Sequence, residues 1–176
     1  MSDTRVIVVT TGIAATASVL SSTLLSWVEI GGVKPDLALV IIALVAMSRG
    51  EMSGQISGFL SGLLEDAISV SPLGFTAMIR TVVGFLCGKL EGLVMMDRLL
   101  LPSAVAVVAT VMKTLVVELL SIVFSISTRY GVFSDSFLIE VALNCAIAPA
   151  LYVLLSSLPV LIHRSRNQLV RSRTGQ

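Results

Sequence analysis

Residues 49–90 read RGEMSGQISGFLSGLLEDAISVSPLGFTAMIRTVVGFLCGKL, and they contain two apolar segments joined by a Ser-Pro-Leu-Gly turn. Glycine recurs at every fourth position in both segments: Gly54, Gly58 and Gly62 in the first, and Gly84, Gly88 and, just beyond this stretch, Gly92 in the second. This spacing places the glycines on one face of a helix, where the absence of side chains lets two backbones approach closely in lipid. The repeat therefore predicts a hairpin of two tightly packed helices.

Two opposite charges continue the glycine faces toward the turn. Asp66 lies four residues after Gly62, and Arg80 lies four residues before Gly84. In an antiparallel hairpin with equal arms, Gly62 would face Gly84 and the two charges would meet at the outer end, so we expect an Asp66–Arg80 ion pair. Packing within this chain is the favoured interpretation of the glycines, and recruitment of a foreign helix is the alternative.

The composition is that of a membrane protein. The chain has 176 residues, of which 55% are apolar and 13% charged, and its mean hydropathy is +0.97. Soluble domains carry about 25% charged residues. Because the apolar residues extend along nearly the whole chain, its exterior must be apolar as well, which requires membrane lipids. The net charge of +1 gives no indication of a nucleic-acid partner.

Six apolar segments predict a single transmembrane domain, an all-α bundle of six helices. Their approximate ranges are 6–28, 35–48, 52–69, 75–94, 102–127 and 137–162, followed by a basic tail at 163–176. The second segment is short for a bilayer core of about 30 Å. Pro149 predicts a kink in the sixth segment.

The distribution of Lys and Arg predicts the orientation. With the N-terminus in the cytoplasm, the inner segments hold eight basic residues and the outer loops hold two, Lys34 and Arg129. Cytoplasmic loops of membrane proteins carry the excess of positive charge. We therefore expect a multi-pass protein with both termini in the cytoplasm.

Ionisable side chains inside the apolar segments are candidate functional residues, because charges are costly in lipid. The candidates are Glu65, Asp66, Arg80, Lys113, Glu118 and Glu140, with Asn144 as a polar neighbour. Most of them fall in the predicted outer half, so we expect a loose polar cluster there. The cluster either consists of structural ion pairs and side chains that reach the interface, or it lines a pocket for a partner or ligand.

Lys113 lies near the predicted midplane and needs a partner at that depth. Glu118 follows five residues later, which places it about 140° around the same helix. We therefore expect the partner of Lys113 to come from another span or from another protein.

The first segment has a face of small residues, Ala14, Ser18 and Ser22. Small residues are typical of helix–helix interfaces in membranes. Since no other segment of the chain is an obvious partner for this face, we expect it to contact a second copy or a different protein.

The chain lacks the motifs of common catalytic and metal sites. Its one histidine, His163, lies at a predicted membrane edge, and the sequence has no HExxH, phosphate-loop or CxxC motif. Cys87 and Cys145 fall within apolar segments and are interpreted as small buried hydrophobic residues. We predict a protein that is not an enzyme and has no catalytic residue, cofactor or metal.

Several short motifs follow one another within residues 34–92. They are Lys34-Pro35-Asp36-Leu37, Arg49-Gly50, the Gly58-to-Gly62 repeat with Leu63-Leu64-Glu65-Asp66, and Ser71-Pro72-Leu73-Gly74 before a Gly-x-x-x-Gly helix. In this order they resemble the family of the bacterial rod shape-determining protein MreD. The resemblance covers about a third of the chain. The doubled acid Glu65-Asp66 departs from the family pattern, which has mainly the Asp, and leaves the role of Glu65 open.

The resemblance implies a non-enzymatic scaffold in the bacterial inner membrane that supports cell shape and lateral peptidoglycan synthesis. Its implied partners are an MreC-like protein, MreB, a RodA-type glycosyltransferase and a class B penicillin-binding protein. It also implies a bundle similar to the S components of energy-coupling-factor vitamin transporters, so substrate binding as an S component is the alternative function. The aromatic content of 5% weakens this alternative, because such a pocket needs aromatic or polar contacts.

Overall fold

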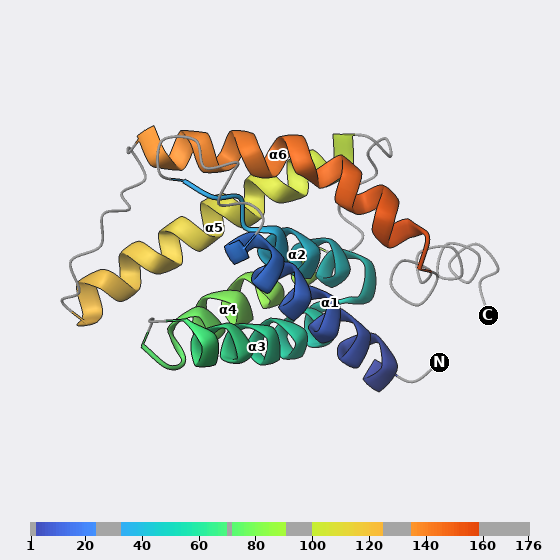
Figure 1. Ribbon diagram of the computed structural model, residues 1–176, viewed down its shortest axis with the longest axis horizontal. Helices are drawn as coiled ribbons and strands as arrows, with labels where there is room; N and C mark the ends of the chain where they lie inside the picture. Colours follow the sequence, from blue (N-terminus) through green and yellow to red (C-terminus); the bar gives the residue numbers. More distant parts are fainter. Residues whose placement is uncertain (1–2, 24–32, 70–71, 91–99, 125–134, 159–176) are drawn as a thin grey trace, which may run out of the picture.

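The computed structural model describes residues 3–23, 33–69, 72–90, 100–124 and 135–158, and this part of the chain forms six α-helices (Figure 1). They are α1 (Asp3–Thr23), α2 (Leu37–Arg49), α3 (Glu51–Ile68), α4 (Phe75–Lys89), α5 (Leu100–Phe124) and α6 (Asp135–Ser156). Each corresponds to one predicted apolar segment. Gly92 and the basic tail at 163–176 lie outside the described residues.

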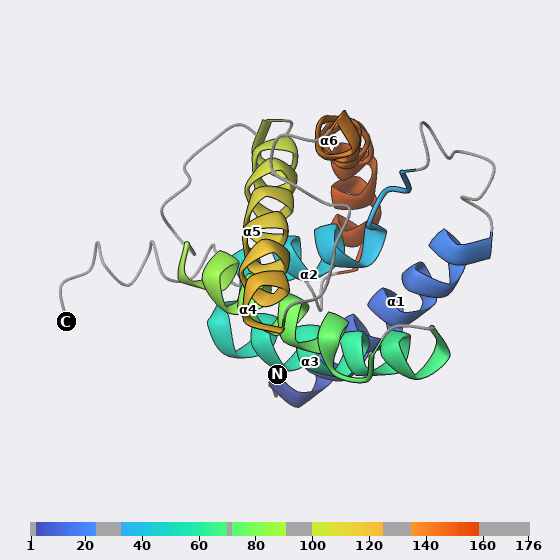
Figure 2. The same ribbon diagram turned by 90° about the vertical axis from the view of Figure 1, so that its left-hand side faces the viewer.

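Helix α2 forms the centre of the bundle. Every residue from Leu37 to Ala46 is buried, and α2 contacts each of the other five helices. A helix that is apolar on all sides is stable only when it is surrounded. Figure 2 shows α5 and α6 on one side of α2, and α1, α3 and α4 on the other.

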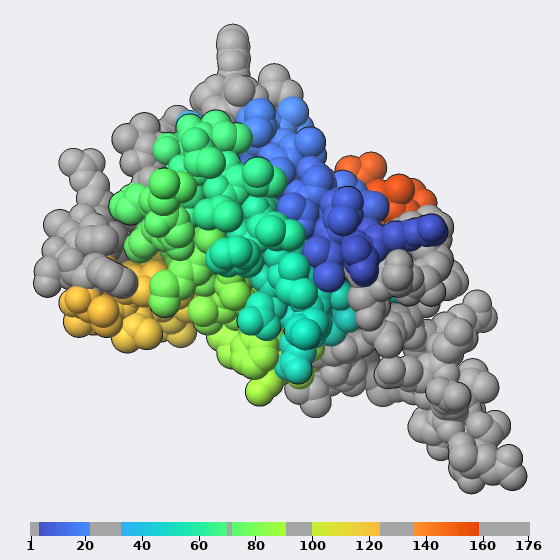
Figure 3. Space-filling model, turned by 90° about the horizontal axis from the view of Figure 1, so that it is seen from below, coloured from blue at the N-terminus to red at the C-terminus, as the bar shows by residue number. Residues whose placement is uncertain are grey.

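The predicted hairpin is confirmed, since α3 and α4 pack closely against each other. A Cβ atom added at Gly54 would lie 2.6 Å from the carbonyl oxygen of Gly84, and one at Gly58 would lie 2.5 Å from that of Arg80. Such distances leave no room for a side chain. Figure 3 shows α1, α3 and α4 lying side by side across one face of the molecule.

The predicted register of the hairpin is wrong. Gly84 faces Gly54 instead of Gly62, and Gly62 faces the backbone of Ala77. The cause is Asp66, whose carboxylate accepts hydrogen bonds from backbone N–H groups at the start of α4. This contact holds the last turn of α3 beside the first turn of α4, and it moves the partner of Gly84 by about two helical turns.

In the described part of the chain, three helices are long and apolar enough to cross a membrane, by length and composition: α1 over Thr4–Ser21, α5 over Leu100–Val123 and α6 over Ser136–Ser156. Helix α2 is apolar but shorter; its 13 residues span about 20 Å at roughly 1.5 Å per residue. The described part is thus that of a helical membrane protein. Helix α6 continues through Pro149 and changes direction in its second half (Figure 1).

Candidate functional site

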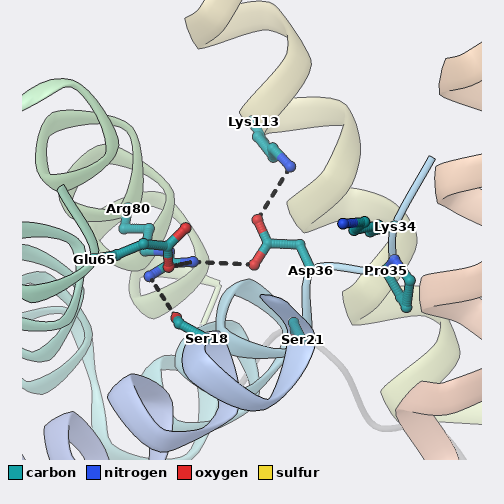
Figure 4. A pocket seen from close by; sticks show the side chains of 8 residues that line it. All are labelled: Ser18, Ser21, Lys34, Pro35, Asp36, Glu65, Arg80 and Lys113. Carbon is teal, nitrogen blue, oxygen red and sulfur yellow. Dashed lines mark hydrogen bonds and ion pairs between the residues drawn. The ribbon is translucent and has the colours of Figure 1, made fainter. Parts of the chain in front are cut away.

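Asp36 occupies the N-cap of α2 and connects three helices. Its Oδ1 accepts a hydrogen bond from the backbone N–H of Leu39 at 3.0 Å, which satisfies a donor that the helix leaves unpaired at its first turn. The same oxygen lies 3.2 Å from Nη2 of Arg80 on α4. Its Oδ2 accepts from Nζ of Lys113 on α5 at 3.0 Å. One carboxylate therefore joins α2, α4 and α5 (Figure 4).

Arg80 extends this network to α1 and α3. Its side chain is 2% exposed, and its Nη2 also forms an ion pair with Glu65 near the end of α3. Its Nη1 donates to Oγ of Ser18 on α1 at 3.2 Å. A buried guanidinium needs several acceptors, and here they come from three other elements of the fold.

Lys113 extends the network to α6. Its Nζ donates to Oε1 of Glu140 at 2.6 Å as well as to Asp36. Asn144, one turn after Glu140, accepts from the backbone N–H of Asp36 at 3.0 Å and donates to Oγ1 of Thr110 at 3.0 Å. The bundle thus has two layers, α5 and α6 on one side of α2 and α1, α3 and α4 on the other. Hydrogen bonds and ion pairs that meet at Asp36 hold these layers together.

A polar cavity of about 250 Å³ lies beside this network (Figure 4). Eight of the described residues line it: Ser18, Ser21, Lys34, Pro35, Asp36, Glu65, Arg80 and Lys113. Three of them carry positive charge and two carry negative charge. No cluster of three or more His, Cys, Asp or Glu side chains suited to a metal ion is found in the described part of the chain.

The structure brings together most of the predicted candidates but not all of them. Glu65, Arg80, Lys113, Glu140 and Asn144 belong to one network. The expected Asp66–Arg80 pair is wrong: Arg80 binds Glu65 and Asp36, while Asp66 binds backbone. Glu118 lies on α5, outside the network.

Asp36 is the functional residue that sequence reasoning missed. The sequence marks Asp36 only as a member of the Lys34-Pro35-Asp36-Leu37 motif. The available signal was an acidic residue immediately before ten consecutive apolar residues, 37–46. A charge at such a position needs partners from other helices.

The small-residue face of α1 does not remain open for another protein. Ala14 is fully buried and Ser18 is 7% exposed, because this face packs inside the bundle, where α1 contacts α2 and α3. The expectation that Ala14 and Ser18 have no partner within this chain is therefore wrong, and contact with a second copy or a different protein stays a prediction. The side chain of Ser22 lies outside the described part.

Asp66→Asn is expected to destabilise the hairpin. The Asp66 carboxylate is 2% exposed and accepts from the backbone N–H groups of Gly74, Thr76 and Ala77 at 3.0, 3.2 and 3.1 Å. An amide loses the negative charge and one acceptor, so the free energy of unfolding should fall by about 1–2 kcal/mol. Thermal unfolding in detergent measures this, with Glu118→Gln as the control. Equal stability of Asp66→Asn and the parent chain would contradict the capping role.

Comparison with known proteins yields one family. A family model described as rod shape-determining protein MreD matches residues 4–158. No curated protein and no solved structure matches the chain. The match extends well beyond the motifs at residues 34–92 and includes all the helices that contribute to the network.

Proposed function

Because the chain belongs to the MreD family of rod shape-determining proteins, we propose that it is a non-enzymatic membrane scaffold or regulator of the bacterial cell-elongation complex. In this role it supports lateral peptidoglycan synthesis through helix–helix contacts with an MreC-like protein. A RodA-type glycosyltransferase, a class B penicillin-binding protein and MreB are further proposed partners.

The observation that supports a scaffold best is the use of charge inside the bundle. Arg80 and Lys113 each contact two carboxylates from different helices. Charges arranged in this way fix the relative positions of helices, which is what a platform for other membrane segments requires.

Exposed apolar side chains provide the surface for such contacts. On α3 they include Phe59, Leu60, Leu63 and Leu64, and on α5 they include Leu115, Leu119 and Ile122. Either face suits lipid tails or an apolar helix of a partner.

Six crossings with both termini in the cytoplasm form the proposed topology, in the bacterial inner membrane. In a background with Cys87 and Cys145 replaced by Ala, a cysteine at Ser71 or Ser134 should react with a membrane-impermeant thiol reagent in intact cells. A cysteine at Ser48 or Gly175 should react only after the cells are opened. Labelling of the Gly175 position in intact cells would contradict the proposed orientation.

Restoration of cell shape tests the function. Expression of this chain in a rod-shaped bacterium depleted of its own MreD-family protein should restore rods, as judged by the length-to-width ratio of the cells. A photo-crosslinking residue at Leu63 or Leu119 should capture the MreC-like protein, whereas one at the buried Ala43 should not. Spherical cells despite normal accumulation of the chain would contradict the proposal.

The alternative function, an S component of a vitamin transporter, gains no support from the cavity. None of the eight residues that line the cavity is aromatic, and flat vitamin rings are bound in large part by aromatic and apolar side chains. The scaffold role is therefore the better proposal.

A further inference from the structure

Two charged groups that line the cavity keep hydrogen-bonding capacity that the network does not use. Among the described residues, Oε2 of Glu65 forms the ion pair with Arg80 but accepts no hydrogen bond, and Oε1 takes no part in the ion pairs of the network. Lys113 has three N–H donors, of which two are used by Asp36 and Glu140. The side chains of Glu65 and Lys113 are 30% and 25% exposed, so both can be reached from the cavity.

The spare acceptor and the spare donor belong to different helices. Glu65 comes from α3 and Lys113 from α5, with Asp36 between them (Figure 4). Both oxygens of Asp36 are already occupied. Glu65 is paired with Arg80, and Lys113 is paired with Asp36 and Glu140. The cavity therefore offers an unused acceptor on one wall and an unused donor on the other, which matches a ligand with an ammonium donor at one end and an anionic oxygen at the other.

The position of the cavity within the bundle narrows the class of ligand. Ser18 and Ser21 lie near the end of α1 and Glu65 in the last turn of α3, while Asp36 begins α2 and Arg80 lies in the second turn of α4. Four helices thus begin or end around the cavity, and Lys113 reaches it from the middle of α5. Lipid headgroups lie beyond the hydrocarbon core, where the helices of a bundle end. Lysine is a common ligand of phosphate.

We propose that this cavity binds a zwitterionic headgroup of the phosphoethanolamine type, with its ammonium on Glu65 and its phosphate on Lys113. Lys34 lies at the exposed rim of the same cavity and adds positive charge on the phosphate side. The proposal goes beyond the role in cell shape and does not depend on it. The source of the headgroup is either phosphatidylethanolamine or a soluble phosphoethanolamine ester.

Binding by the purified full chain in detergent tests the proposal. Native mass spectrometry compares phosphatidylethanolamine with phosphatidylcholine, whose quaternary ammonium has no N–H donor, and with phosphatidylglycerol, which has no cation. The chain should bind phosphatidylethanolamine roughly tenfold more tightly than phosphatidylcholine, as expected for one charge-assisted hydrogen bond of about 1.4 kcal/mol. Glycerophosphoethanolamine, without acyl chains, shows whether the headgroup alone is sufficient.

Variants assign the two ends of the ligand. Glu65→Gln should abolish the preference for ethanolamine over choline, while Glu65→Asp should retain part of it and Glu118→Gln all of it. Lys34→Gln should weaken the binding of phosphatidylethanolamine and phosphatidylcholine equally, since both lipids carry the phosphate. Thermal unfolding shows whether each variant is folded.

Three results would overturn the proposal: equal affinity of the parent chain for phosphatidylethanolamine and phosphatidylcholine, tighter binding of phosphatidylglycerol, or an unchanged preference in folded Glu65→Gln. If only phosphatidylethanolamine binds, the headgroup site is supported and its ligand is the lipid. If glycerophosphoethanolamine binds as well, the site is supported and the headgroup alone is sufficient. Because binding is measured on the isolated chain, its failure would be distinct from a failure to restore cell shape.

Discussion

Gly84→Ala is expected to destabilise the bundle by about 3 kcal/mol, the upper end of the range for overpacking. The added Cβ would collide with the carbonyl oxygen of Gly54, which belongs to the facing backbone. Backbone cannot rotate away as a flexible side chain can, so α3 and α4 must move apart along the whole hairpin. Thermal unfolding in detergent measures the loss, and cell shape in the depleted strain reports its consequence.

Gly12→Ala is the matched control for this substitution. A Cβ at Gly12 meets no atom within 4 Å, and Gly12 lies inside α1. The same chemical change should therefore stabilise the chain, by up to roughly 1 kcal/mol from helix propensity. If Gly84→Ala is as stable as Gly12→Ala, close backbone contact does not hold the hairpin together.

Lys113→Met should be among the most damaging substitutions in the ionic network, at a cost of about 3–5 kcal/mol. Glu140 is 5% exposed, and Lys113 is its one partner among the described residues. Removing the lysine leaves a buried carboxylate without a cation, while Asp36 retains Arg80.

Substitution of the other member of the pair, Glu140→Gln, should lower the free energy of unfolding by only about 1 kcal/mol, because Lys113 keeps its hydrogen bond to Asp36. The double variant Lys113→Met/Glu140→Gln should be more stable than Lys113→Met alone, since no buried charge is then left unpaired. Thermal unfolding of the parent chain, the two single variants and the double variant measures the coupling between Lys113 and Glu140. A double variant as unstable as the sum of the two single variants would show that Lys113 and Glu140 are not coupled.

The corrected register also changes what is expected at Arg80. Its direct partners are Glu65 and Asp36, so the effects of Asp66→Asn and Arg80→Gln on stability should add, provided that Asp66→Asn leaves the register of α3 and α4 unchanged. Substitutions at sites that do not touch and share no partner have effects that add within about 0.5 kcal/mol. Strong coupling between these two positions would contradict the observed hydrogen bonds of Asp66.

The sequence by itself determined the class of protein, the places of the helices and the family. These properties depend on composition and on spacing along one helix. An apolar run predicts a helix in lipid wherever it packs, a glycine at every fourth residue creates a bare face on any helix, and an ordered set of short motifs identifies a family without knowledge of contacts.

Only the tertiary structure decided which charges meet. The partners of Arg80 depend on how far α3 slides along α4, and the Asp66 cap sets this distance through backbone N–H groups that no spacing rule locates. Asp36 became the centre of the network because α2 lies between the two layers and brings its N-terminus within reach of both α4 and α5. An ion pair forms over a few ångströms, so it depends on the relative translation and rotation of whole helices, which packing alone determines.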